Sequence, residues 1–169
     1  MIAVTAEDSN TFKVCPDGEL MGYQRSARTV AITQLHQAAK TPKERHECAL
    51  DALLQRVLQD LSATTPRQLS LITWSLARLH LRRDLRGLKS TLERRAFELD
   101  PQGVSMTMWS LAAALWRQPL FDRLGEAAYW KLGELDAQGL SNVLWSCAVL
   151  RKDSLFSLLL IAASRINQV

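Results

Sequence analysis

Apolar residues recur at helical spacing along much of the chain. After Thr65 they fall three or four positions apart, which places them on one face of a helix with 3.6 residues per turn. That face carries Leu69, Ile72, Leu76 and Leu79. The pattern predicts an amphipathic helix that begins just after Thr65 and buries this face.

Three stretches of the chain repeat this pattern, with a tryptophan at the same place in each. They read TPRQLSLITWSLARL from Thr65, DPQGVSMTMWSLAAA from Asp100 and DAQGLSNVLWSCAVL from Asp136. The tryptophans are 35 and 36 positions apart: Trp74, Trp109 and Trp145. Self-similarity at such a period is typical of stacked helical repeats.

Each repeat carries signals for two helices. The side chains of Thr65, Asp100 and Asp136 can accept hydrogen bonds from free amides at a helix start, and proline follows two of them. A second apolar stretch follows in every unit, with corresponding leucines at Leu85, Leu120 and Leu155. Upstream, residues 41–44 have capping-box spacing and predict a helix through about Leu61, with residues 26–39 as its partner helix.

The sequence therefore predicts an all-α protein, an α-solenoid of about three and a half stacked antiparallel helix pairs with a 35–36-residue repeat. Residues 1–24 show no helical period and are expected to form an irregular or disordered leader. Residues 25–169 form the solenoid. Its units span approximately 26–64, 65–99, 100–135 and 136–169.

The tryptophans lie on the flank of each predicted first helix, beside small residues. We expect them to be core residues, because a large Trp beside small Ser and Ala lets adjacent helices interlock. A surface on which nucleobases stack is the alternative interpretation.

Side chains opposite the core face are not needed for packing and can serve another purpose. Arg, Gln, Asn and Ser can pair donors and acceptors with a base edge, and serial helical repeats are an established way to bind single-stranded RNA. An ordinary solvated ridge is the alternative. The candidate RNA-binding ridge consists of Arg67, Ser75, Arg78, Gln102, Ser110, Gln138, Asn142 and Ser146.

The net charge of +4 is mild, but the basic residues are unevenly distributed. Eight of them lie between Arg67 and Arg95, against two acidic residues. A solvated helix face and a phosphate-contacting surface explain this cluster equally well. The candidate phosphate contacts are Arg82, Arg83, Arg86 and Lys89.

The last helix, residues 153–166, is expected to pack against another protein chain or against further repeats. Residues 155–163 read LFSLLLIAA, which is apolar nearly all round a helix and too short to span a bilayer. An end helix of a solenoid normally has a polar outer face. The candidate partner interface consists of Leu155, Phe156, Leu159 and Leu160.

Catalytic and metal-binding patterns are scarce. The chain has no Gly-rich phosphate loop, no HExxH and no GxSxG, so we expect neither an enzyme nor a cofactor or metal site. Three widely separated cysteines without a CxxC pair predict reduced, structural thiols. No apolar run reaches the length of a transmembrane segment, and the first 24 residues resemble neither a secretory signal nor a transit peptide.

The strings DPQGVSMTMWSLAAAL and DAQGLSNVLWSCAVL resemble the octotricopeptide repeats of organellar proteins and the related helical repeats of proteins with RAP or FAST-kinase-like regions. The resemblance covers about residues 41–169. It implies an α-solenoid in a mitochondrion or plastid that binds single-stranded RNA or rRNA and acts in RNA metabolism or ribosome assembly. The competing hypothesis is a non-catalytic protein-interaction scaffold, a subunit of a larger membrane or ribosomal complex.

Overall fold

The computed structural model describes residues 17–40, 47–59, 61–80, 86–116 and 119–166. Within these ranges every regular element is a helix, so the predicted all-α class is confirmed. The α-helices are α1 (Asp17–Lys40), α2 (Glu47–Leu58), α3 (Pro66–Arg78), α4 (Arg86–Arg94), α5 (Pro101–Ala113), α6 (Pro119–Trp130), α7 (Ala137–Val149) and α8 (Asp153–Ile166). Two short 3₁₀ helices, η1 (Ala96–Glu98) and η2 (Leu132–Glu134), follow α4 and α6.

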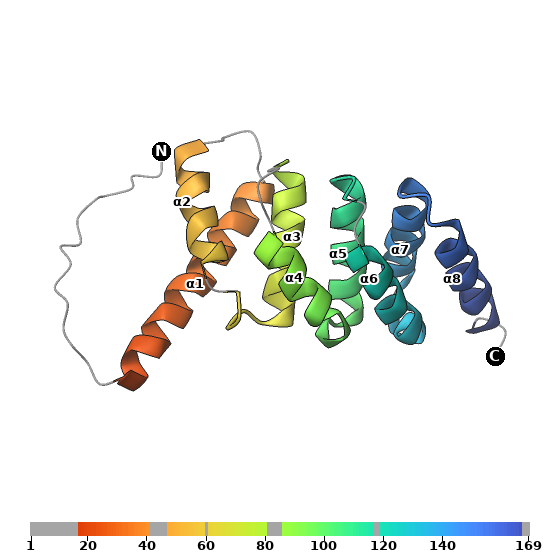
Figure 1. Ribbon diagram of the computed structural model, residues 1–169, viewed down its shortest axis with the longest axis horizontal. Coiled ribbons are helices and arrows are strands. Elements are labelled where there is room, and N and C mark those ends of the chain that lie inside the picture. The colour runs from red at the N-terminus through yellow and green to blue at the C-terminus, as the bar shows by residue number, and fades with distance from the viewer. Residues whose placement is uncertain (1–16, 41–46, 60, 81–85, 117–118, 167–169) are drawn as a thin grey trace.

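The helices lie side by side in an elongated array (Figure 1). Helices α1, α3, α5 and α7, here called the odd row, each contact the next one along the array. Helices α4, α6 and α8, here called the even row, do the same and cover one side of the odd row. Two layers of helices thus enclose one continuous core.

The predicted starts of α3, α5 and α7 are confirmed. Thr65 forms a capping box with Gln68: its hydroxyl accepts the Gln68 N–H at 3.3 Å, and its own N–H donates to Gln68 Oε1 at 3.0 Å. The Asp100 and Asp136 carboxylates each accept an N–H three residues on, at 2.6 Å. These bonds satisfy amides that a helix start would otherwise leave free.

The same three helices end alike, each followed by a residue in the left-handed conformation. His80, Leu115 and Arg151 have φ values of 54°, 55° and 53°. Beyond the last two, the backbone N–H groups of Trp116 and Lys152 each donate at 2.8 Å to a carbonyl five residues back. Such bonds satisfy carbonyl groups at the end of a helix, and the left-handed residue that permits them is usually glycine, which none of these three is.

The core follows the predicted face of α3. Leu69, Ile72, Leu76 and Leu79 are all buried, which confirms that prediction. The same apolar layer continues along the array from Ile32 and Leu35 in α1 to Leu159 in α8. Cys147, also in this layer, is a free thiol, and burial raises its pKa to about 11.

Serine and glycine bring the odd-row helices together. A Cβ atom on Gly103 of α5 would lie 3.3 Å from the Ser70 hydroxyl of α3, and one on Gly139 of α7 would lie 3.5 Å from the Ser105 hydroxyl of α5. The same pairing of a serine with a glycine therefore recurs at both contacts.

The predicted role of the tryptophans as core residues is wrong for Trp145, which is 45% exposed. Trp74 and Trp109 are half-buried, and Trp74 packs against the core from its edge. The predicted boundaries at the N-terminal end also need correction. Helix α1 begins at Asp17, so residues 17–24 are helical and not part of an irregular leader. Residues 1–16 and the predicted capping box at 41–44 lie outside the described residues.

Candidate nucleic-acid interface

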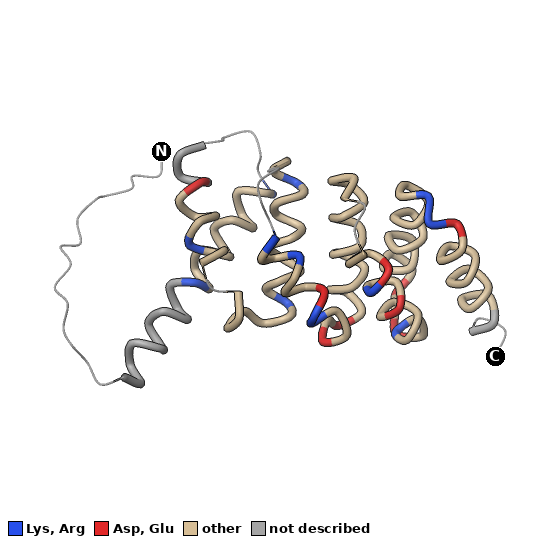
Figure 2. Tube along the Cα trace, viewed as in Figure 1, with Lys and Arg blue, Asp and Glu red and all other residues tan. Residues whose placement is uncertain are grey.

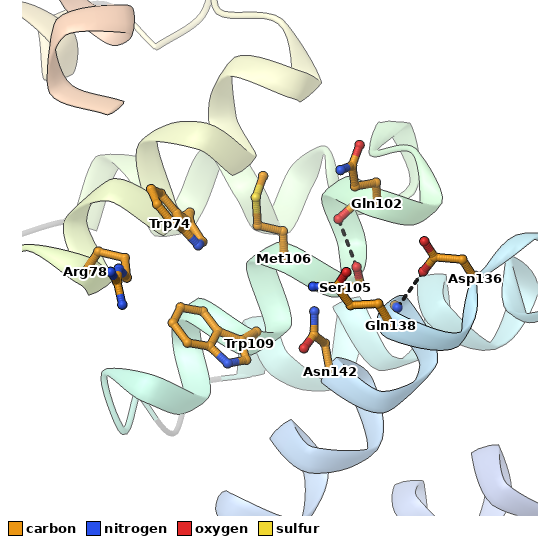
Figure 3. A pocket seen from close by; sticks show the side chains of 10 residues that line it. Trp74, Arg78, Gln102, Ser105, Met106, Trp109, Asp136, Gln138 and Asn142 are labelled. Carbon is orange, nitrogen blue, oxygen red and sulfur yellow. Dashed lines mark hydrogen bonds between the residues drawn. The ribbon is translucent and has the colours of Figure 1, made fainter. Parts of the chain in front are cut away.

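An open pocket of about 390 Å³ lies on the outer surface of the odd row, across α3, α5 and α7 (Figure 3). Its walls combine indole rings, a thioether, carboxamides and one guanidinium group. It is lined by Trp74, Arg78, Gln102, Ser105, Met106, Trp109, Asp136, Gln138, Gly139 and Asn142. Four residues of the predicted ridge, Arg78, Gln102, Gln138 and Asn142, are therefore brought together here.

The tryptophans form a line along this surface, each held by neighbours. The Trp74 ring has the Arg78 guanidinium carbon 5.7 Å from its centre and the His36 ring 5.0 Å away, tilted by 51°. Trp109 and Trp145 stack on each other, with ring centres 6.2 Å apart and planes 26° from parallel. Each of the three indole rings thus has an aromatic ring of the chain itself beside it.

The carboxamides lie beside the rings. Gln102 and Gln138 occupy the same place in α5 and α7, and both are exposed. Asn142, one turn further along α7, is half-buried and borders the pocket as well. Arg67 takes the corresponding place in α3 and is exposed, although it does not line the pocket. Each carboxamide offers two donors and one acceptor oxygen to a ligand.

The three serines assigned to the ridge are not on it, and that prediction is wrong. Ser75, Ser110 and Ser146 are buried. Their hydroxyls donate to the backbone carbonyl four residues back, at 2.7, 2.7 and 2.5 Å. Such bonds are the ordinary way for a helical serine to satisfy its hydroxyl, so these groups are not available to RNA.

The tryptophans are the site residues that the sequence analysis missed as such. In each repeat the exposed polar side chain, the residue four positions on and the tryptophan seven positions on share one helix face, since at 100° per residue they span only about 60°. The serine after each tryptophan lies roughly 80° from the first of these. Helix geometry alone therefore assigns the tryptophan, and not the serine, to the ridge.

Charge is sparse on this surface. Helices α5 and α7 contain no Lys, Arg, Asp or Glu, and most of the coloured charges in Figure 2 lie elsewhere in the array. Asp136 borders the pocket, but its carboxylate caps α7 through the Gly139 N–H. Arg78 of α3 borders the pocket, and Arg67 lies at the start of the same helix.

The two candidate phosphate contacts that the structure describes lie apart from the pocket. Arg86 and Lys89 are on α4, in the even row, and neither lines the pocket. The Lys89 ammonium lies 4.8 Å from the centre of the Trp116 ring, where it packs against the protein itself. Arg82 and Arg83 lie outside the described residues. The structure thus does not join Arg86 and Lys89 to the ridge.

His36 supports one end of the aromatic line. Its Nδ1 atom is buried and has no hydrogen-bond partner. Burial lowers the pKa of His36 below its ordinary value, and the nearby Lys40 ammonium lowers it further. The neutral ring is therefore the form that packs against Trp74.

The candidate partner interface on α8 is only partly exposed. Leu159 is fully buried within the chain, so its assignment to a partner surface is wrong. Leu155 and Phe156 are partly buried against the chain's own core, and Leu155 fills the space over Gly125 of α6. Leu160 is exposed.

Other apolar side chains near α8 are exposed instead. Tyr129, Trp130, Leu158 and Ile161 line a second hollow between α6 and α8. Within the described ranges, no helix combines the length and the apolar character needed to cross a membrane. The same ranges hold no group of three or more His, Cys, Asp or Glu residues placed to bind a metal.

Comparison of the chain with protein-family models, with curated proteins and with solved structures finds no match.

Proposed function

We propose that this protein binds single-stranded RNA along the odd row. The observation that carries the proposal is the pocket, where Trp74 and Trp109 lie beside the carboxamides of Gln102, Gln138 and Asn142. Aromatic rings bind bases through their faces, and carboxamides bind base edges through paired donors and acceptors. Unpaired bases expose both surfaces, whereas paired bases in a duplex do not.

The proposal includes an α-solenoid architecture with a 35–36-residue repeat. Its support is the recurrence of whole structural features at that spacing. The capping residues Thr65, Asp100 and Asp136, and the left-handed residues that end the same helices, each recur 35 and then 36 positions apart. A role in organellar RNA metabolism or ribosome assembly is what the octotricopeptide resemblance adds.

Fluorescence anisotropy with a labelled pool of short single-stranded RNAs tests the proposal. If only Arg67 and Arg78 contact phosphates, the logarithm of affinity falls with the logarithm of salt concentration with a slope of roughly −1.4, from about −0.7 per contact. Arg78→Ala should weaken binding to all sequences alike and flatten the slope by about 0.7. A slope near −2.8 would instead indicate four contacts, as expected if the predicted phosphate cluster were used.

Gln102→Ala and Asn142→Ala should change which sequences bind best, because their carboxamides are proposed to contact base edges. Gln55→Ala is the matched control, since Gln55 is an exposed carboxamide on α2, away from the pocket. Duplex RNA of the same length should bind more weakly than single strands. Absence of single-strand binding at low salt refutes the proposal.

A non-catalytic protein-interaction scaffold is the second candidate function. The observation that favours it is the exposed apolar side chains of α6 and α8, with Trp130 76% exposed. Contiguous apolar surface on a soluble protein often marks an interaction site. A chain that fails to bind RNA but has a partner lost on Trp130→Ser substitution supports this function instead.

A further inference from the structure

The tryptophans of the odd row do not all stack on one another. Trp109 and Trp145 are already stacked on each other, while Trp74 has His36 and Arg78 as its ring neighbours. Trp74 and Trp109 both border the pocket, and Trp145 does not. In Figure 3 their side chains extend from α3 and α5 toward the same open space.

A flat ligand cannot enter between Trp109 and Trp145 as they stand. A base inserted between two rings needs the rings to be roughly 6.8 Å apart along their normal, twice the ~3.4 Å rise of stacked bases. The centres of Trp109 and Trp145 are 6.2 Å apart, and any lateral offset makes the separation between their planes smaller still. This pair therefore offers outer faces only.

The pocket has the size and chemistry for a single ring system. Its volume of about 390 Å³ is near the lower end of the roughly 300–1,000 Å³ of small-ligand pockets. Met106 adds a polarisable apolar surface between the two helices that carry the rings. The carboxamides of Gln138 and Asn142 point toward the open space beside Trp109, while that of Gln102 lines the pocket at its other end (Figure 3).

We infer that one nucleobase of a bound strand leaves the stack of its neighbouring bases and enters this pocket. There Trp74 and Trp109 contact the faces of the base, and the carboxamides contact its edge. The inference rests on the proposed function and adds the place at which a base is inserted. Trp74 is the ring that distinguishes this pocket from the Trp109–Trp145 stack, since its ring neighbours are His36 and Arg78. Trp145 contacts the strand outside the pocket.

Photocrosslinking of the full chain to short single-stranded RNAs containing 5-iodouridine tests this placement, because that base crosslinks efficiently to aromatic rings on which it stacks. Mass spectrometry of the crosslinked peptides should identify Trp74 or Trp109. Trp74→Ala should reduce the crosslink yield and weaken RNA binding by about five- to 150-fold, the usual effect of removing one stacked aromatic ring. Trp74→Phe, which keeps a flat ring, should retain both.

Trp130→Ala is the matched control, because Trp130 is exposed on the even row and lies far from the pocket lining. It should leave RNA affinity and crosslink yield unchanged. Crosslinks found mainly at Trp145 or Trp130 overturn the inference, as does a Trp74→Phe variant that is folded, binds RNA as before and gives no crosslink at either residue 74 or Trp109. These outcomes leave RNA binding itself intact, whereas failure of the unaltered chain to bind RNA overturns the proposed function as well.

Discussion

The contact between Trp109 and Trp145 joins two neighbouring helices of the odd row, and its contribution to stability can be isolated. Fully buried Trp→Ala changes cost about 3–5 kcal/mol, so roughly 2 kcal/mol is expected for half-buried Trp109 and somewhat less for more exposed Trp145. Stacked rings add about 0.5–1.5 kcal/mol beyond the area they bury. The double variant should therefore lose about 0.5–1.5 kcal/mol less than the two single variants together.

Urea unfolding followed by circular dichroism measures all four free energies of unfolding. The control cycle pairs Trp74 with Trp145, which lie on α3 and α7 with α5 between them. Those two substitutions should be additive to within about 0.3–0.5 kcal/mol. If the Trp109 and Trp145 substitutions are equally additive, the stacking of the two rings does not exist in solution.

Three further predictions concern packing, backbone and pH. Gly125→Ala should lower the free energy of unfolding by about 1–2 kcal/mol in urea titrations, because its Cβ would collide with a methyl group of Leu155 in α8. Gly133→Ala is the control and should leave the free energy of unfolding unchanged, because its Cβ would have no neighbour within 4 Å. Equal effects of the two substitutions would contradict the packing of α6 against α8. Leu115→Gly should raise the melting temperature and add about 0.5–1 kcal/mol to the free energy of unfolding, since φ is 55° and the side chain is exposed. A lower melting temperature would show that the leucine side chain packs against the rest of the chain. The pKa of His36 is lowered in the folded chain, so the unfolded chain binds the proton more readily and stability should fall as pH drops below about 6.5. His36→Gln should reduce that fall, and a fall that is unchanged in this variant would exclude His36 as its cause.

Local signals in the sequence predict the helices well because they act within a few residues. Proline and a capping side chain define where α3 and α5 begin, and spacing of leucines defines the buried face of α3. The start of α1 at Asp17 was missed, since no capping signal or helical period marks it in the sequence. The ends of α3, α5 and α7 carry no glycine, so their left-handed residues give no signal either.

The candidate site was predicted in part. Gln102, Gln138 and Asn142 were identified because polar side chains opposite an apolar face are free for other uses. The tryptophans were assigned to the core because a large Trp beside small Ser and Ala can interlock adjacent helices, whereas in the structure small residues make the helix contact themselves. Ser70 against Gly103 is such a contact, and it depends on how two helices approach, which composition does not reveal.

The chemistry of the odd row favours a nucleobase, rather than an apolar protein surface, as the ligand proposed for it. An apolar protein surface would cover the indole rings but leave the carboxamides of Gln102, Gln138 and Asn142 without hydrogen bonds, at about 1–3 kcal/mol for each buried group left unpaired. A nucleobase has flat faces for the rings and a polar edge for the carboxamides, so it satisfies both. The near absence of charge on α5 and α7 then makes base contacts, rather than phosphate contacts, the main source of affinity. This is why we expect the shallow salt dependence to be the most informative single measurement on the RNA complex.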